Sequence, residues 1–176
     1  EFLEFINGKK LLENSQSYSM VYAGHQFGYF VPQLGDGRAI NLGSVNSCHL
    51  QTKGSGPTRY SRRADGRAVL RSSIREYIMG EAMYSLGIAS TRALAIIDSD
   101  THVNREWEQE SCSIVMRMSP SWIRIGTFEF FANTKKSKEN LTQLADYVIK
   151  ESYPHLIDTE NKYEKMFYSL VDKTAL

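Results

Sequence analysis

The sequence has few cysteines, no long apolar run and almost no net charge, and these absences narrow the class of protein. Its two cysteines, Cys48 and Cys112, have neither the spacing of a metal site nor the number needed for a disulfide framework. We therefore expect two buried thiols in a reducing compartment. No apolar run approaches the ~20 residues of a membrane-spanning helix, and no secretory signal opens the chain. The formal net charge of +1 favours a local binding site over a general polyanion-binding coat.

Several catalytic and binding patterns are also missing. The sequence contains no Gly-Lys-Ser/Thr of the Walker type, no internal repeat and no low-complexity linker. The four histidines are far apart in unrelated contexts, so a histidine–metal cluster or a Ser–His nucleophile pair has no support. They are His25, His49, His102 and His155. With 176 residues, 41% of them hydrophobic, the chain can still bury a sizeable core.

The most informative feature that is present runs from Lys53 to Glu76. A lysine ends a strand-like segment, a glycine-rich turn follows, and a glutamate then lies in a helix-like segment. Protein kinases use this order to hold nucleotide phosphates, with a strand lysine steadied by a helix glutamate. Six arginines and one acid, Asp65, lie between the pair, which favours a polyphosphate site. The arginines are Arg59, Arg62, Arg63, Arg67, Arg71 and Arg75.

The direction of Lys53 follows from strand alternation in residues 48–53. Cys48, Leu50 and Thr52 alternate with His49, Gln51 and Lys53, so Lys53 is expected on the face away from Leu50 and toward a cleft. A solvated surface lysine is the alternative, but Gly54 and Gly56 follow at once and favour a phosphate contact.

The clearest predicted helix covers residues 67–86, and Gly87 supplies its stop. Its apolar stripe consists of Leu70, Ile74, Tyr77, Ile78, Met83 and Leu86. Arginines recur every four residues from Arg63 to Arg75, either as phosphate ligands or as a solvated helix face, and we assign Arg71 to the solvated face. Glu76 and Glu81 lie five apart, roughly 140° around the helix, so only one of them can face Lys53. Helix geometry does not choose between them.

Two further segments carry anion-binding residues. Gly35-Asp-Gly-Arg38 precedes a strand predicted over residues 39–45, and it is either a phosphate-binding turn or an ordinary hairpin turn. Strands are also predicted over residues 93–97 and 112–116, with a polar loop over residues 98–110. Arg117 and Arg124, seven apart, either reach one anion or form surface salt bridges.

The composition and the periodicity of the sequence divide it into three zones. We predict an aromatic, irregular extension over residues 1–34, a sheet-plus-helix lobe over residues 35–125 and the start of a helical region over residues 126–176. A helix is expected over residues 161–176 without a stop signal, and the chain starts at Glu1 without methionine. We therefore expect a piece, residues 1–176, of a larger kinase-like domain.

Several blocks together resemble the selenoprotein O family, whose bacterial members are also called YdiU proteins. They are Gly24-His-Gln-Phe-Gly28, Gln33-Leu-Gly-Asp-Gly-Arg38, Lys53-Gly-Ser-Gly56, Asp65-Gly-Arg-Ala-Val-Leu-Arg-Ser-Ser-Ile-Arg-Glu76, and residues 117–128. The similarity extends in order along almost the whole chain. Thr52 and Trp122 depart from the Leu- and His-like choices usual in that family.

The resemblance implies an α+β fold, with a pseudokinase N-terminal lobe of a small antiparallel sheet and an αC-like helix, followed by helices of an incomplete second lobe. It implies transfer of AMP from ATP, bound in reverse relative to a kinase, to Ser, Thr or Tyr hydroxyls of proteins. Glu76, not Glu81, becomes the ion-pair partner of Lys53. The implied nucleotide-binding positions are Gly35, Gly37, Arg38, Lys53, Asp65, Gly66, Arg117 and Arg124.

The resemblance also implies Mg²⁺, but the family's block with the catalytic aspartate and the metal-holding Asn and Asp has no counterpart here. Asp158 and Asp172 lie in segments that lack this pattern, so we expect no catalytic residue and no metal ligand in this chain, and an inactive fragment. ATP and hydroxyl-bearing proteins are the expected partners, with no membrane and no nucleic acid. The expected location is the cytoplasm of a bacterium or the mitochondrion of a eukaryote.

Two other functions stay open at this point. A kinase-like phosphotransferase shares the Lys–Glu arrangement. A non-enzymatic nucleotide- or RNA-binding module explains the arginines equally well, although the few aromatic residues within the arginine run argue against base stacking.

Overall fold

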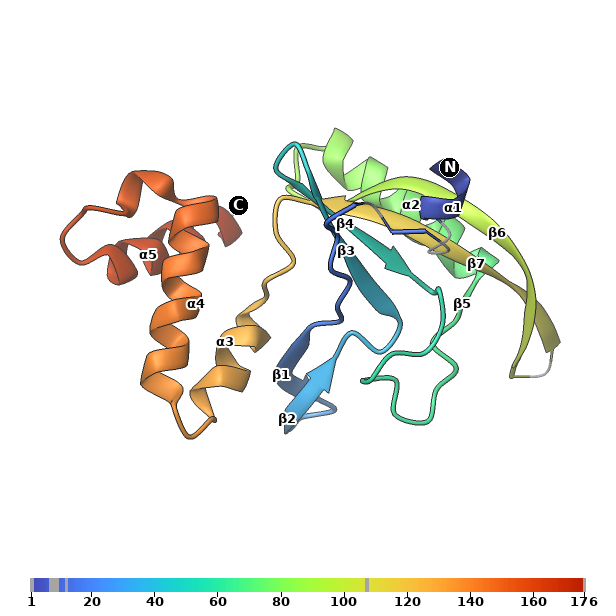
Figure 1. The fold of residues 1–176 in the computed structure, drawn as a ribbon, viewed down its shortest axis with the longest axis horizontal. Helices are drawn as coiled ribbons and strands as arrows, with labels where there is room; N and C mark the ends of the chain where they lie inside the picture. Colours follow the sequence, from blue (N-terminus) through green and yellow to red (C-terminus); the bar gives the residue numbers. More distant parts are fainter. Residues whose placement is uncertain (1, 7–9, 12, 107, 176) are drawn as a thin grey trace. The chain divides into compact units, whose positions relative to one another are not determined.

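The computed structural model describes residues 2–6, 10–11, 13–106 and 108–175 (Figure 1). Within these residues it is an α+β protein with five α-helices, one short 3-10 helix and seven β-strands, which confirms the predicted class. The chain divides into two compact units. The first comprises Glu1–Val21 and Leu34–Trp122, and the second comprises Tyr22–Gln33 and Ile123–Leu176.

The first unit is built on an antiparallel sheet. β3 (Ala39–Val45) pairs with β4 (Cys48–Lys53), β4 pairs with β7 (Glu108–Ser119), and β6 (Arg92–Arg105) also pairs with β7. The predicted strands over residues 39–45 and 48–53 are confirmed with their bounds. In the β4–β7 register Gln51 lies opposite Arg117 and Lys53 opposite Val115. Gln51 and Arg117, which are 66 positions apart in the sequence, thus become direct cross-strand neighbours.

The loop predicted over residues 98–110 is wrong, because β6 and β7 continue through it as a long hairpin. Val103 pairs with Glu110 and Arg105 with Glu108. Polar residues such as Asp98 and Asn104 have low intrinsic β-propensity, but pairing with β7 satisfies their backbone groups and overrides it.

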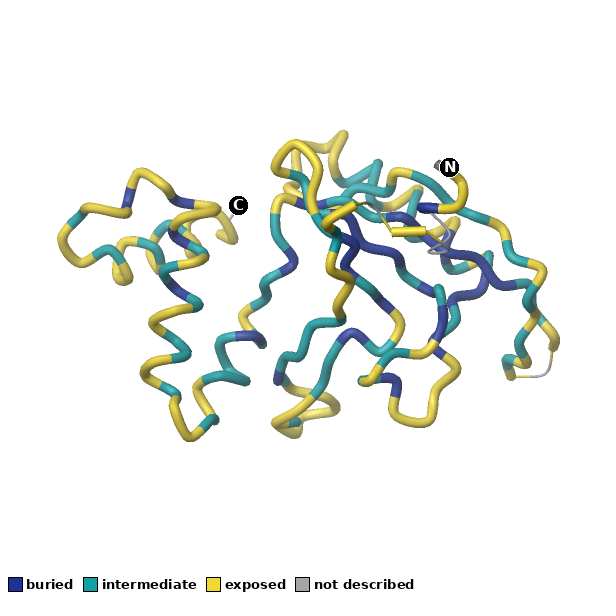
Figure 2. The backbone as a smooth tube through the Cα atoms, in the orientation of Figure 1, coloured by how far each residue is buried: buried dark blue, intermediate teal, exposed yellow. Residues whose placement is uncertain are grey.

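The two faces of this sheet have different contents. On one face Leu42, Leu50 and Met116 form a buried cluster with Phe5 of α1 (Phe2–Ile6). Figure 2 shows the buried stretches concentrated along the central strands β4 and β7. The other face is covered by α2 (Leu70–Ser85), which packs against β6 and β7 (Figure 1). Lys53 of β4 and Arg117 of β7 face this helix, where both form ion pairs with Glu76.

Helix α2 begins later than predicted. Ala68 and Val69 form the short strand β5 (Ala68–Val69) opposite Ser113 and Cys112 of β7, so the helix starts at Leu70. Arg63 and Arg67 therefore precede the helix, and the expected row of arginines along one helix face is wrong for them. A helical pattern of residues does not show that Ala68 and Val69 pair with a strand of the sheet instead of joining the helix.

The apolar stripe predicted for α2 is only partly buried. The residue of α2 that is buried is Ser73, at 1% exposure, and its hydroxyl accepts a hydrogen bond from Ser113 of β7 at 2.7 Å. Ile74 and Ile78 remain exposed, at 42% and 58%. The side of the helix that meets the sheet thus includes a buried polar residue as well as apolar ones.

We predicted that residues 1–34 would be irregular, and this prediction is wrong for part of the segment. β1 (Val21–Gln26) and β2 (Tyr29–Gly35) form a two-stranded sheet. Phe27 and Gly28 join the strands with φ of 52° and 82°, the positive values that a tight hairpin turn needs. Phenylalanine is an unusual residue in that conformation, which hid the turn in the sequence.

The second unit is mainly helical, as predicted from residue 126 onward. Its elements are α3 (Ile125–Ala132), α4 (Ser137–Ser152), the 3-10 helix η1 (Pro154–Leu156) and α5 (Lys162–Thr174). Ile149, Tyr153 and Leu156 form its buried cluster, with Met166 of α5 packed against it. The helix expected to reach Leu176 ends at Thr174, and Leu176 itself lies outside the described residues.

Cys112 is buried as predicted, Cys48 is only half-buried, and both are free thiols. Burial raises the pKa of the Cys112 thiol, which keeps it protonated. No helix among the described residues is both long and apolar enough to cross a membrane.

Candidate functional site

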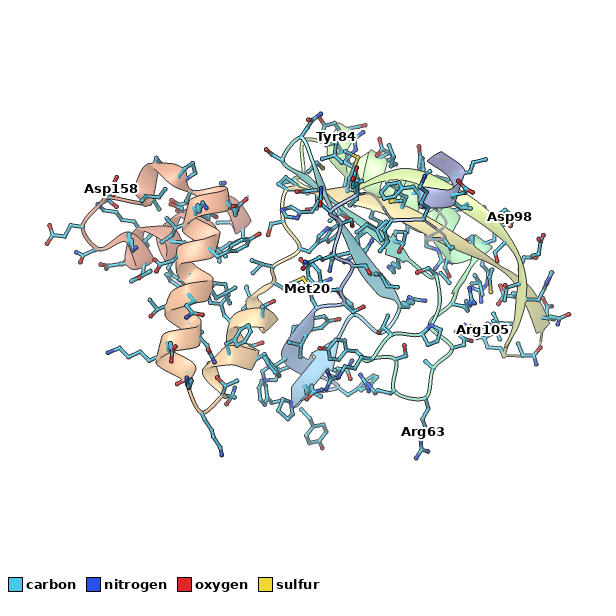
Figure 3. All side chains as sticks on the ribbon, in the orientation of Figure 1. Met20, Arg63, Tyr84, Asp98, Arg105 and Asp158 are labelled. Carbon is cyan, nitrogen blue, oxygen red and sulfur yellow. The ribbon has the colours of Figure 1, made fainter. Side chains whose placement is uncertain are left out.

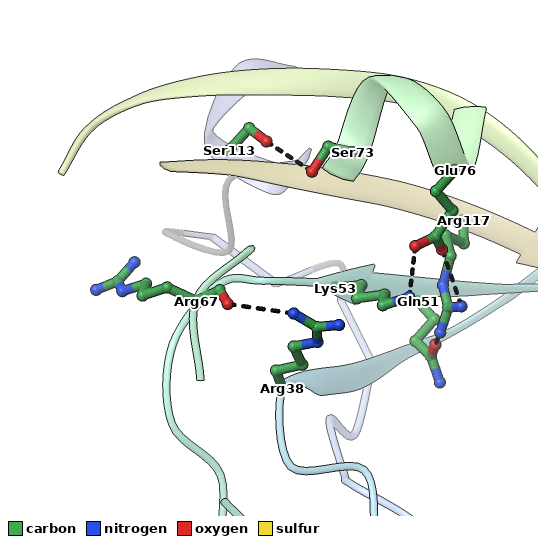
Figure 4. Close-up of polar contacts among 8 residues, drawn as sticks. All are labelled: Arg38, Gln51, Lys53, Arg67, Ser73, Glu76, Ser113 and Arg117. Atoms are coloured by element: carbon green, nitrogen blue, oxygen red, sulfur yellow. Dashed lines mark hydrogen bonds and ion pairs between the residues drawn. The ribbon is translucent and has the colours of Figure 1, made fainter. Parts of the chain in front are cut away.

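The site is centred on an ion pair between strand β4 and helix α2. Nζ of Lys53 donates to Oε2 of Glu76 (Figure 4). The Ser73–Ser113 hydrogen bond, less than one helical turn before Glu76, fixes α2 on β7 at the height where the glutamate meets the lysine. Lys53 thus lies on the α2 side, as strand alternation predicted. Glu81 instead binds Arg92 through two hydrogen bonds of 2.7 and 2.6 Å, so the structure selects Glu76.

Arg117 shares the same carboxylate. Its Nη1 donates to Oε1 of Glu76 at 3.1 Å, while Lys53 uses the other oxygen. The guanidinium also lies over the ring of Trp122, 4.8 Å from its centroid. Arg117, at one of the positions implied by the resemblance, thus joins Lys53 and Glu76 in one cluster within the first unit.

Gln51 is a site residue that the sequence analysis did not single out. Its Oε1 accepts a hydrogen bond from Nη2 of Arg117, and its Nε2 donates to Oδ1 of Asn41 at 3.0 Å. Nδ2 of Asn41 in turn donates to the backbone oxygen of Tyr18 at 3.2 Å. Gln51 is 0% exposed and Asn41 is 2% exposed. The alternation that placed Lys53 also placed Gln51 on the same face, so the signal was present in the sequence.

Charge is unevenly distributed in this cluster. Burial lowers the pKa of Lys53, and the positive charges of Arg117 and Arg38 lower it further, while Glu76 opposes them. Burial acts to raise the pKa of Glu76, but Lys53 and Arg117 outweigh it and hold that pKa below its ordinary value. One carboxylate thus stands among three cations, Lys53, Arg117 and Arg38. The surplus positive charge suits an anionic ligand.

Arg38 reaches this region from the glycine-rich turn. The Arg38 carbonyl accepts a hydrogen bond of 2.7 Å from the N–H of Gly54, directly after Lys53. Its Nη1 lies 3.5 Å from the backbone oxygen of Arg67, and it has no carboxylate partner within the described parts of the chain (Figure 4). An exposed guanidinium beside Lys53 remains available to a ligand.

The loop of residues 54–66 packs tightly on this turn. A Cβ added to Gly35 would lie 2.3 Å from Cγ of Tyr60, so no larger residue fits there. Gly66, with φ of 69°, approaches Gly56 so closely that an added Cβ would lie 2.2 Å from the Gly56 oxygen. The N–H of Gly56 donates to the oxygen of Gly66 at 3.2 Å, which closes the loop. Gly37 likewise lies against the backbone of Tyr60.

Asp65 has structural partners in this structure. Its carboxylate binds both terminal nitrogens of Arg105, at 2.7 and 2.9 Å, and accepts a hydrogen bond of 2.8 Å from the Arg67 N–H. These hydrogen bonds hold the pKa of Asp65 below its ordinary value. Arg71, assigned to a solvated face, forms a salt bridge with Glu110 at the exposed helix surface.

Arg124 belongs to the second unit. Its guanidinium lies over the ring of Tyr22, 4.8 Å from the centroid, and its N–H donates to Oγ1 of Thr127 at 3.3 Å at the start of α3. The expectation that Arg117 and Arg124 reach one anion concerns residues of two units and stays a prediction. Within the parts of the chain that the structure describes, no three His, Cys, Asp or Glu residues gather into a metal-binding group.

Comparison with known proteins agrees with the whole-chain resemblance. The family model described as "Protein adenylyltransferase SelO" matches residues 1–176. Proteins named "Protein nucleotidyltransferase YdiU" from Myxococcus xanthus and Thioalkalivibrio sulfidiphilus are 48% and 49% identical over 180 residues. Each alignment covers 99% of this chain and 36% of the relative, so the chain spans little more than a third of the relatives' length. The chain belongs to the SelO family.

Proposed function

We propose that this chain forms the nucleotide-cradling part of a protein adenylyltransferase, which transfers AMP from ATP to Ser, Thr or Tyr hydroxyls of proteins. The first unit would act as a kinase-like N-terminal lobe, with α2 in the place of the helix that carries the ion-pair glutamate. The positions proposed to contact ATP are Gly35, Gly37, Arg38, Lys53, Asp65, Gly66, Arg117 and Arg124. The names of the relatives and of the matching family support nucleotidyl transfer in the parent protein.

The observation that carries this proposal is the excess of cations around Glu76. Transfer of a nucleotidyl group requires neutralisation of the polyphosphate, and fixed positive groups do this best in a partly buried site. Lys53 and Arg117 are held by one carboxylate, and Arg38 stands beside them without an acid of its own among the described residues. A triphosphate would replace the missing negative charge.

Asp65 would need to act differently from the cations. Its carboxylate is already held by Arg105, and like charge disfavours a direct contact with phosphate. We propose that Asp65 and Gly66 shape the loop against Gly56, so that the backbone and not the carboxylate faces the phosphates. In this assignment the backbone of both residues contacts the phosphates, while the Asp65 carboxylate holds the loop in position.

Magnesium and the group that activates the hydroxyl would come from outside this chain. When bound, the metal would stabilise charge on the phosphate oxygens. The described residues do not fit a resident metal, since they provide no cluster of three ligands. We therefore propose that the 176-residue chain binds ATP but does not transfer AMP alone.

A kinase-like phosphotransferase is the second candidate, since the Lys53–Glu76 pair serves both reactions. Incubating the full-length parent with a protein acceptor and ATP labelled at the α or the γ phosphate separates the two. Label entering protein from the α position supports AMP transfer. Label entering only from the γ position overturns it and supports phosphoryl transfer.

A Lys53→Met parent serves as the matched loss-of-function control, because it removes the central cation. Glu81→Gln is the control for helix α2, because Glu81 lies outside the cluster and binds Arg92. Retained α-label transfer in Lys53→Met would show that the labelling does not depend on the proposed site. Loss of transfer in Glu81→Gln as well would show that the effect is not specific to the Lys53–Glu76 pair.

A further inference from the structure

Three arginines in the loop of residues 54–66 are not used by the proposed nucleotide site. Arg59, Arg62 and Arg63 are all exposed, and each lies within seven residues of Gly66. Figure 3 shows the Arg63 side chain extending away from the loop into open space. The loop therefore presents a basic surface next to the glycine-rich turn, and this surface has no assigned ligand.

Hydrogen bonds to the glycine-rich turn hold the loop in place. Oγ1 of Thr58 donates to the backbone oxygen of Asp36 at 2.7 Å, and the Ser61 hydroxyl donates to that of Gly37. Within the loop, the N–H of Thr58 donates to Oγ of Ser61 at 2.6 Å. Ordered backbone lowers the entropy cost that a partner would otherwise meet on binding.

The acids beside these arginines, Asp65 in the loop and Asp36 in the glycine-rich turn, are engaged or buried. Asp65 forms a two-point salt bridge with Arg105, and Asp36 is only 4% exposed. Arg59 and Arg63 have no ion-pair partner anywhere in the described parts of the chain. Arg62 has a left-handed backbone with φ of 55°, a strained conformation for a residue with a long side chain. Such strain concentrates at functional loops.

From this arrangement we propose that the loop is a docking surface for an acidic segment of the protein that receives the nucleotide. Carboxylates match the guanidinium fork in geometry and charge. The loop is attached to Gly35–Arg38 and contains Asp65 and Gly66, so an acidic segment bound here lies beside the proposed ATP positions. The inference rests on the proposed function for the identity of the acceptor.

An acidic protein segment fits this surface better than a single-stranded nucleic acid does. Binding to single strands without sequence preference relies on aromatic side chains that stack with bases. The loop contains one aromatic residue, Tyr60, whose ring packs over Gly35. The surface thus supplies charge without a free stacking platform.

The test measures binding of three fluorescent probes to this chain by anisotropy. They are a serine peptide with four flanking glutamates, the same peptide with glutamines, and a uridine oligonucleotide of equal length. The variants are Arg59→Glu/Arg63→Glu, the milder Arg59→Gln/Arg63→Gln, and the control Lys135→Glu/Lys138→Glu. The control makes the same charge change at exposed lysines of the second unit.

We expect the acidic peptide to bind at least about tenfold more tightly than the glutamine peptide, and the loop reversal to weaken it about tenfold. The control variant should change the affinity for the acidic peptide by less than about twofold. The loop variants should change the affinity for ATP by less than about twofold. Where the reversed variant loses its folded circular dichroism spectrum, the glutamine variant decides.

Equal affinity for the two peptides, or acidic-peptide binding unaffected by the loop variants, overturns the inference. Tighter binding of the oligonucleotide than of the acidic peptide also overturns it. These measurements are separate from the labelling experiment. Failure of α-label transfer overturns the proposed function, whereas intact transfer without acidic-peptide binding overturns this inference alone.

Discussion

Gln51 accepts, at Oε1, a hydrogen bond from Nη2 of Arg117 on the neighbouring strand. This bond ties the orientation of a proposed phosphate ligand to the buried amides of Gln51 and Asn41. A buried amide with satisfied donors and acceptors has one favourable orientation. Gln51 is therefore a positioning residue for Arg117.

Replacing Gln51 with Met should cost stability and weaken nucleotide binding together. Asn41 would lose a buried partner, and an unsatisfied buried polar group costs about 1 to 3 kcal/mol. Urea unfolding measures the stability change, and calorimetric titration measures ATP affinity. Gln143→Met, at an exposed position of α4, is the control and should leave both unchanged. Unchanged ATP affinity in a folded Gln51→Met variant would contradict the positioning role.

Gly66 and Gly87 allow two costs to be separated, because both have positive φ, 69° and 81°. An added Cβ at Gly87 meets no atom within 4 Å, so Gly87→Ala should lose only about 1 kcal/mol of unfolding free energy from backbone strain. At Gly66 the Cβ would also collide with the Gly56 oxygen. Gly66→Ala should therefore lose more stability and weaken ATP binding as the loop moves. Equal losses of stability for both variants in thermal unfolding would show that the loop moves away from the added Cβ of residue 66 without a loss of stability.

The sequence predicted the parts of the site that depend on local periodicity. Alternation in β4 correctly placed Lys53 on the face away from Leu50. It did not reveal Gln51 as a ligand of Arg117, because that contact depends on the register of two strands distant in sequence. The choice of Glu76 over Glu81 likewise required the resemblance or the structure, since it depends on how α2 is rotated against β7. The predicted row of arginines along one helix face is wrong at Arg67, because Ala68 and Val69 pair with β7 and the helix begins only after them.

Neutralising Glu76 should destabilise the protein and change its response to acid. Glu76→Gln removes the carboxylate that pairs with the half-buried Lys53 and Arg117, which should cost about 1 to 3 kcal/mol of unfolding free energy at neutral pH. The folded pKa of Glu76 lies below its unfolded value of 4.5, so this stability is present above pH 4.5 and is lost as the pH falls through the folded pKa. The difference between wild type and Glu76→Gln should therefore shrink below pH 4.5 in urea titrations. Glu81→Gln should cost less than Glu76→Gln, and equal costs would contradict the central place of Glu76.

ATP affinity should depend on the protonation of Lys53. Burial, reinforced by Arg117 and Arg38, lowers the pKa of free Lys53 below its ordinary value of 10.5. A bound polyphosphate favours the charged amine and raises that pKa, so binding takes up a proton at pH values between the Lys53 pKa of the free protein and that of the complex. Affinity should be at full strength below this pKa and should decrease as the pH rises through it.

Calorimetric titration of ATP from about pH 7 to about pH 10 measures this decrease. In Lys53→Arg the guanidinium stays charged across this range, so the affinity of that variant should change little with pH. The comparison also controls for ATP itself, which is the same in both titrations. An equal decrease in the two proteins would assign the titration to another group and remove Lys53 from the phosphate-binding cations.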